Sequence, residues 1–165
     1  MSGTTHREWN WSEGLITALA VGGFLVILGA VFGLTPGIPQ KIGIFFTDLT
    51  GVPYPSASSQ FFLPAPSNPA EHLDVYGAVS SFAVGISILQ AVILVLRLNF
   101  RSPINKIAET IGNLFFWVCA IIAVNFFLLA GTHNGWFTFW ASLFIFAGGS
   151  LLVQFLVHLI KKRHL

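Results

Sequence analysis

The sequence predicts an all-α integral membrane protein, a bundle of four transmembrane helices with a long, proline-rich first loop outside the membrane. Three observations predict this fold. Four apolar runs are each long enough to cross a bilayer, which takes about 20 residues. Charged residues make up only 8% of the 165 residues, whereas a soluble domain carries about 25%. Lys and Arg residues also gather on one side of the predicted membrane, as they do in multi-pass proteins.

The four runs follow one another in a single membrane domain, residues 1–165. The third helix is expected to begin before its apolar part, at Pro103 with Ser102 as its cap, because Ser favours the N-cap and Pro the first turn. No Asp, Glu, Lys or Arg lies in the middle of any run. Pumps and proton relays usually keep an ionisable group at membrane depth, so active transport is disfavoured. The expected spans cover about residues 15–34, 75–96, 107–130 and 136–160.

The basic residues predict how the helices cross the membrane. Seven of the eight Lys and Arg residues flank the spans on one side, and only Lys41 lies on the other. The positive-inside rule therefore places the N- and C-termini in the cytoplasm. The seven residues are Arg7, Arg97, Arg101, Lys106, Lys161, Lys162 and Arg163.

The first connection, about residues 35–74, is expected to form a folded cap on the outer membrane surface. It holds seven of the eight prolines, but apolar residues such as Phe45 and Phe61 recur in it as well. Long connections without structure of their own are uncommon and are often functional. Pro39 is expected to open a short helix that runs to Leu49.

Small residues recur at helical spacing on three of the spans. Helices in a bilayer associate through close packing, and small residues let their backbones approach. These stripes predict packing faces, and the partner is either another helix of the chain or another subunit. The residues are Ala18, Gly22, Gly29 and Gly33 on the first span, Gly77, Ser81 and Gly85 on the second, and Gly148 on the fourth.

Neutral polar side chains form a second pattern inside the membrane, toward the cytoplasmic side of the last three spans. Two interpretations are open. The side chains either hydrogen-bond between helices or line a small polar pocket that opens to the cytoplasm. The residues of this predicted amide cluster are Gln90, Asn113, Ser150, Gln154 and His158.

Three residues at the outer surface are candidate ligands for a transition metal, because imidazole and carboxylate groups both bind such ions. His72 and Asp74 precede the second span, and His133 lies in the short loop before the fourth. Their spacing matches no metal-binding signature, and Asp74 also suits the first turn of a helix. The single cysteine, Cys119, lies within a span and has no base near it in sequence, so no catalytic residue and no firm cofactor are predicted.

These patterns favour a non-catalytic subunit or scaffold of a multi-subunit membrane complex. Its expected partners are the lipid bilayer and other integral membrane proteins or copies of itself. Nucleic acid is not an expected partner, because the net charge is only +2. Two alternatives remain. One is a passive channel or small-solute carrier that uses the amide cluster. The other is an external-face, metal-binding subunit of a membrane oxidase or monooxygenase that uses His72, Asp74 and His133.

Overall fold

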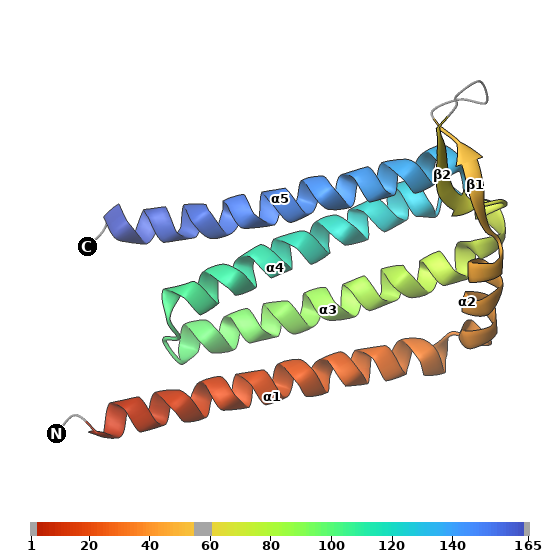
Figure 1. The fold of residues 1–165 in the computed structure, drawn as a ribbon. Helices are drawn as coiled ribbons and strands as arrows, with labels where there is room; N and C mark the ends of the chain where they lie inside the picture. Colours follow the sequence, from red (N-terminus) through yellow and green to blue (C-terminus); the bar gives the residue numbers. More distant parts are fainter. Residues whose placement is uncertain (1–2, 55–60, 164–165) are drawn as a thin grey trace.

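Four long helices form the body of the molecule. The computed structural model describes residues 3–54 and 61–163, with side chains for residues 11, 13–54 and 61–160. Each helix is long and apolar enough to cross a membrane, so the predicted four-span helical fold is confirmed. The start of α1 and the end of α5 lie at the same end of the molecule (Figure 1). The helices are α1, Gly3–Leu34; α3, Leu73–Asn99; α4, Ile104–Ala123; and α5, His133–Arg163.

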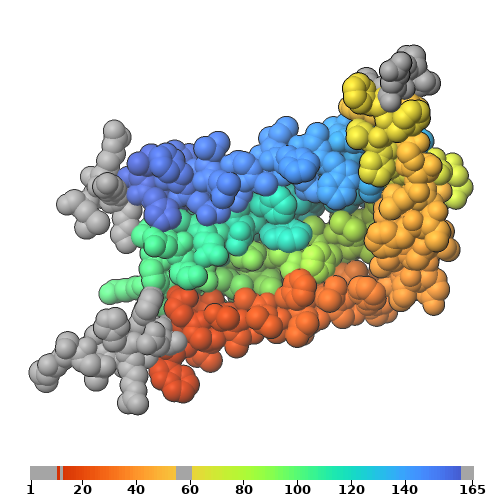
Figure 2. Space-filling model, in the orientation of Figure 1, coloured from red at the N-terminus to blue at the C-terminus, as the bar shows by residue number. Residues whose placement is uncertain are grey.

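The long helices pack in chain order. Helix α1 packs against α3, α3 against α4, and α4 against α5, so that α1 and α5 lie at opposite edges of the array (Figure 1). Among the described side chains of α1, only Ile16 is buried. Figure 2 shows α1, in red and orange, along one edge of the molecule with its outer side uncovered. Helix α1 is therefore the most peripheral part of the bundle.

A folded cap joins α1 to α3 at the end of the bundle opposite the chain termini (Figure 1). We call this end the cap end and the opposite one the terminal end. Helix α2 starts just after Gly37, whose φ of 68° is in the left-handed region, and it agrees with the predicted short helix. The strands β1 and β2 then form an antiparallel hairpin in which Leu49 pairs with Pro66. The elements are α2, Ile38–Thr47; β1, Leu49–Pro53; β2, Phe62–Pro66; and the 3₁₀ turn η1, Pro69–His72.

The turn between α3 and α4 differs from the prediction. The N-cap of α4 is Pro103, and no side chain caps the helix. The hydroxyl of Ser102 instead donates a hydrogen bond to the Glu13 carboxylate of α1. The predicted capping role of Ser102 is therefore wrong, because a carboxylate on a distant helix binds that hydroxyl.

The buried core lies at the cap end, where α3, α4 and α5 meet beneath β2. Helix α4 continues into a π-helical turn, η2, Val124–Leu128. Such single turns bend the backbone inside longer helices. Here the turn brings Val124 and Leu128 into the core. The buried residues of this core are Ala65, Tyr76, Ala123, Val124, Leu128, Trp136 and Phe139.

Candidate functional site

The first polar group lies at the cap end, where Asp48 and His72 connect the end of α2 to the start of α3. His72 Nε2 donates to Asp48 Oδ2 over 2.8 Å, and the His72 residue is only 4% exposed. The same carboxylate oxygen accepts the backbone N–H of Asn68 at 3.1 Å. The hydrogen bond from His72, and after it that from Asn68, hold the pKa of Asp48 below its ordinary value, because both stabilise the charged form.

Aromatic rings pack beside His72. The ring of Phe45 stands edge-on to that of His72, with 5.2 Å between centroids, and it also contacts Tyr76 and Trp136. Trp136 Nε1 donates to the Pro64 carbonyl of β2 at 3.0 Å, which fastens the hairpin to α5. The hydroxyl of Tyr76 is buried and has no hydrogen-bond partner within the described chain.

The three candidate metal ligands each bind a different partner. His72 binds the carboxylate described above. Asp74 Oδ2 accepts from Lys41 Nζ at 2.6 Å, and His133 Nε2 donates to the Pro66 carbonyl at 2.9 Å. Among the side chains that the structure describes, those of residues 11, 13–54 and 61–160, no group of three or more His, Cys, Asp or Glu is placed to hold a metal ion. Each of the three side chains is thus bonded to a protein group other than the remaining two.

The second polar group lies at the terminal end and centres on Arg97 of α3. Its Nη1 donates to the Lys106 carbonyl at 2.5 Å and to the Thr110 hydroxyl, while Nη2 lies 3.9 Å from Glu13 Oε2. Arg97 thereby joins α1, α3 and α4. The side chains of Arg97 and Glu13 are 13% and 19% exposed. At this burial the loss of either partner leaves an uncompensated charge.

Sequence reasoning assigned Arg97 only to membrane orientation and gave Glu13 no role. A signal was present, because Glu13 opens the first candidate span and Arg97 lies near the end of the second. In an up-and-down arrangement of spans these two positions meet at one membrane surface. Opposite charges at matching depth on neighbouring spans are thus a usable sequence signal for a contact between helices.

The structure joins part of the predicted amide cluster. Gln154 Nε2 lies 3.4 Å from Ser150 Oγ, and His158 Nδ1 donates to the Gln154 carbonyl at 2.8 Å. On its other side, His158 Nε2 lies 2.9 Å from Asn105 Oδ1 of α4. His158 therefore connects α5 to the first turn of α4, a contact that the sequence did not predict.

The rest of the cluster is less connected. Gln90 and Asn113 make no side-chain hydrogen bond in the part of the chain that the structure describes. Gln154 packs tightly on Gly112. A Cβ placed at Gly112 would lie 2.6 Å from both Cγ and Nε2 of Gln154. The Gln154 side chain thus fills the space between α4 and α5.

Glycine brings α1 and α3 together at two points. A Cβ at Gly85 would lie 2.7 Å from Ile27 Cγ2, and one at Gly23 would lie 2.6 Å from Leu89 Cδ1. Gly85 belongs to the predicted stripe on the second span, whereas Gly23 is outside the predicted stripe on the first. Real Cβ atoms essentially never lie this close, so the two helices approach here because both positions lack a side chain.

The predicted stripe on α1 makes no such contact. Its four residues are exposed, and no atom of another described segment lies within 4 Å of a Cβ placed at Gly22, Gly29 or Gly33. At 3.6 residues per turn the stripe lies about 130° around the helix from the side that faces α3. Gly77 and Gly148 likewise have free space, and the Ser81 hydroxyl donates to its own helix. We call Ala18, Gly22, Gly29 and Gly33 the α1 outer face.

These features define the class of the protein as a multi-pass membrane protein with four candidate spans. Its hydrogen-bonded groups lie at the cap end and the terminal end, with glycine contacts between them. No family model, curated protein or solved structure matches the chain.

Proposed function

We propose that the chain is a non-catalytic subunit of a membrane complex, and that its α1 outer face contacts a transmembrane helix of another integral membrane protein. The observation that carries this proposal is the direction of that face. It points away from α3, and no other described segment covers it. Small residues on an exposed face let a second backbone approach closely in a bilayer, where van der Waals packing drives helix association.

The opposite edge of the bundle provides a comparison. Both edge helices expose large apolar residues, such as Val26 at 71% exposure on α1 and Phe144 at 77% on α5. Large apolar side chains suit contact with lipid tails. On α1, four exposed small residues in one stripe also let the backbone of another helix approach closely.

The polar groups of the chain support a structural role. Arg97 joins three helices, and the Asp48–His72 pair anchors the cap to α3. Each group is used to hold elements of the chain together. This arrangement favours a scaffold over an enzyme.

The same geometry weighs against the two alternatives. A channel that used the amide cluster would need open space beside Gln154, but that side chain packs on Gly112. An external metal site would need His72, Asp74 and His133 to converge, but each binds a different partner.

A co-purification experiment tests the subunit proposal. The tagged chain is expressed in its source membrane, extracted in mild detergent and analysed by mass spectrometry. A double variant, Gly29→Leu with Gly33→Leu, fills the α1 outer face. The matched control, Gly148→Leu, makes the same replacement on α5, where a Cβ also has free space.

We expect the wild-type chain and the control to recover the same membrane proteins. The double variant should recover at least about tenfold less, because overpacking costs about 1–3 kcal/mol at each of the two positions and about 1.4 kcal/mol is tenfold in affinity. A chain that purifies alone and monomeric would contradict the proposal. Undiminished recovery by the double variant would exclude the α1 outer face as the contact.

A further inference from the structure

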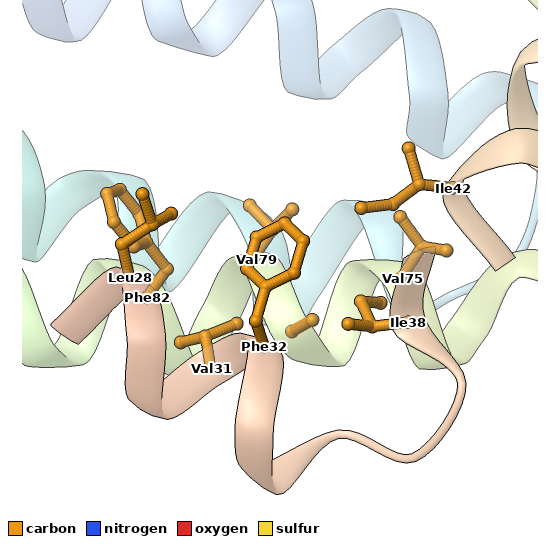
Figure 3. Close-up of a pocket in the computed structure, with 9 residues that line it drawn as sticks. Leu28, Val31, Phe32, Ile38, Ile42, Val75, Val79 and Phe82 are labelled. Atoms are coloured by element: carbon orange, nitrogen blue, oxygen red, sulfur yellow. The ribbon is translucent and has the colours of Figure 1, made fainter. Parts of the chain in front are cut away.

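A polar cleft lies at the terminal end, between the start of α1 and the turn from α3 to α4. It encloses about 510 Å³. By contrast, the groove of about 180 Å³ between α1, α2 and α3 near the cap end is lined by apolar side chains alone (Figure 3). The polar cleft receives side chains from three helices, among them Glu13 and Thr17 of α1, Arg97 of α3, and Asn105 and Lys106 of α4.

The cleft lies where the spans pass from apolar to polar sequence. Glu13 lies two residues before the apolar run of residues 15–34, and Arg97 lies two residues before the end of the candidate span Pro69–Asn99. Lys106 lies two residues after the start of the third span, Ile104–Leu128. The headgroups of a bilayer lie at this boundary, just outside the hydrocarbon core. The phosphate of a lipid in the adjoining leaflet therefore lies at the same membrane depth as the cleft and can enter it.

The charges of the residues that line the cleft favour binding of a group with a single negative charge. Arg97 and Lys106 are cations and Glu13 is an anion, which leaves one net positive charge among the lining residues. The only ion pair of Lys106 within the described chain is at 3.4 Å to Glu109, and both side chains are 51% exposed. Exposed pairs of this kind contribute little, so Lys106 Nζ is available to a phosphate.

Two further donors face no competing partner. Arg97 Nε is buried and has no hydrogen-bond partner among the described residues. The first turn of α4 adds the backbone N–H of Asn105 and the positive end of the helix dipole, whereas the N–H of Lys106 donates to the Pro103 carbonyl at 3.0 Å. This helix start thus acts together with two basic side chains from different helices.

We propose that this cleft binds the phosphate group of an anionic phospholipid, held by Lys106, by Arg97 and by the first turn of α4. The proposal goes beyond the subunit role and does not depend on it. Basic pockets between transmembrane helices are known to accept lipid headgroups. A lipid is favoured over free phosphate because the cleft opens at headgroup depth, where the acyl chains of the same molecule can lie along the exposed, apolar Val21 and Leu28, which share the face of α1 with Thr17. The single carboxylate of Glu13 disfavours a second anionic group.

Native mass spectrometry of the delipidated, full chain in detergent tests this assignment. The chain is titrated with phosphatidylglycerol and with phosphatidylcholine of the same acyl composition. We expect the wild-type chain to bind the anionic lipid at least about fivefold more tightly, the preference that one basic side chain confers near a charged headgroup. Lys106→Gln should abolish most of that preference.

The control is Lys41→Gln, which removes the same charge at the cap end and should retain the preference. Because Lys106 is half exposed, its variant is expected to fold, and size-exclusion chromatography verifies this. Equal affinity of the wild-type chain for both lipids would overturn the proposal, as would an unchanged preference in Lys106→Gln. Release of bound phosphatidylglycerol by millimolar inorganic phosphate would overturn the lipid assignment in favour of a free phosphate site.

Discussion

His72 Nε2 donates to Asp48 Oδ2 over 2.8 Å and thereby joins the end of α2 to the start of α3 across 24 positions of the chain. Both strands of the hairpin lie between these two residues. The pair therefore closes the base of the cap. The bonds from Trp136 to the Pro64 carbonyl and from His133 to the Pro66 carbonyl fasten the same hairpin to α5. Lys41 of α2 also pairs with Asp74 of α3, so the cap is held to the bundle at several points.

The acid stability of the cap follows from Asp48. Its pKa is held below its ordinary value of 3.8, chiefly by the hydrogen bond from His72. A carboxylate with a lowered pKa contributes stability that is fully present above the unfolded-state value and is lost as the pH falls through the folded-state value. We therefore expect the unfolding temperature of the purified protein to be insensitive to this group above about pH 5 and to fall below about pH 4.

Thermal unfolding in detergent at a series of pH values measures this effect. Asp48→Asn should unfold at a lower temperature than the wild-type chain at neutral pH and should lose the acid-dependent decline. Asp74→Asn is the matched control, because it removes a neighbouring, largely exposed carboxylate whose pair with Lys41 contributes little. Coincident curves for Asp48→Asn and the wild-type chain would show that the pair does not stabilise the cap.

The sequence predicts the spans and the helix of the cap because their signals are local. Run length alone identifies each span, and Pro39 marks the start of α2. The hairpin is different. Pro53, Pro64 and Pro66 lie in its strands, and proline normally argues against a central strand. A sheet of only two strands has edges alone, which is the setting in which proline is tolerated.

The contacts of the candidate sites depend on tertiary structure. Asp48 and His72 meet only because α2 lies across the end of the bundle, which no pattern along the chain reveals. The stripe rule also has a limit. Small-residue spacing predicts the contact of Gly85, a residue of α3 that packs against α1. It does not predict the contact of Gly23, because the side of α1 that faces α3 is formed by residues of mixed size. Spacing finds faces of a helix, and only the packed structure shows which face is covered.

The contact between α1 and α3 should show coupling between Gly85 and Ile27. Gly85→Ala places a methyl group 2.7 Å from Ile27 Cγ2, and overpacking of this kind costs about 1–3 kcal/mol. Combined with Ile27→Ala, the substitution should cost less than the sum of the two single changes, because the truncated side chain makes room. Unfolding in mixed micelles measures the four free energies.

The control for that cycle pairs Gly85→Ala with Ile145→Ala on α5, a residue that is 69% exposed. These two changes lie on different helices and should add to within about 0.5 kcal/mol. Additivity in the Gly85 and Ile27 cycle as well would mean that α1 does not lie on α3 at this point.

The orientation in the membrane is open to direct labelling. Seven of the eight basic residues lie at the terminal end, which predicts that this end faces the cytoplasm. Four of them, Arg7 and Lys161–Arg163, have side chains outside those that the structure describes. In a Cys119→Ser background, Thr50→Cys of the cap should react with an impermeant maleimide on intact cells. Phe100→Cys, in the α3–α4 turn, should react only after permeabilisation, and the reverse pattern would invert the predicted orientation.

The first turn of α5 should tolerate no side chain at Gly135. A Cβ there would lie 2.2 Å from the backbone oxygen of Phe127 in η2, and backbone cannot swing aside as a side chain can. Gly135→Ala must therefore separate α5 from the π-helical turn and disturb the core contact that Trp136 makes next to it. We expect the free energy of unfolding to fall by about 3 kcal/mol, the upper end of what overpacking costs.

Gly148→Ala provides the matched control, because it makes the same replacement in the same helix where no atom lies within 4 Å. Alanine favours helix over glycine by up to about 1 kcal/mol, so this variant should unfold no more easily than the wild-type chain. Equilibrium unfolding in mixed micelles measures both, and near-ultraviolet circular dichroism reports on the tryptophans of the core. If the two variants lose stability equally, the cost lies in replacing glycine within a membrane helix and not in the close approach of α5 to η2. A loss confined to Gly135→Ala would show that the close approach of the start of α5 to the π-helical turn is required for the stability of the fold.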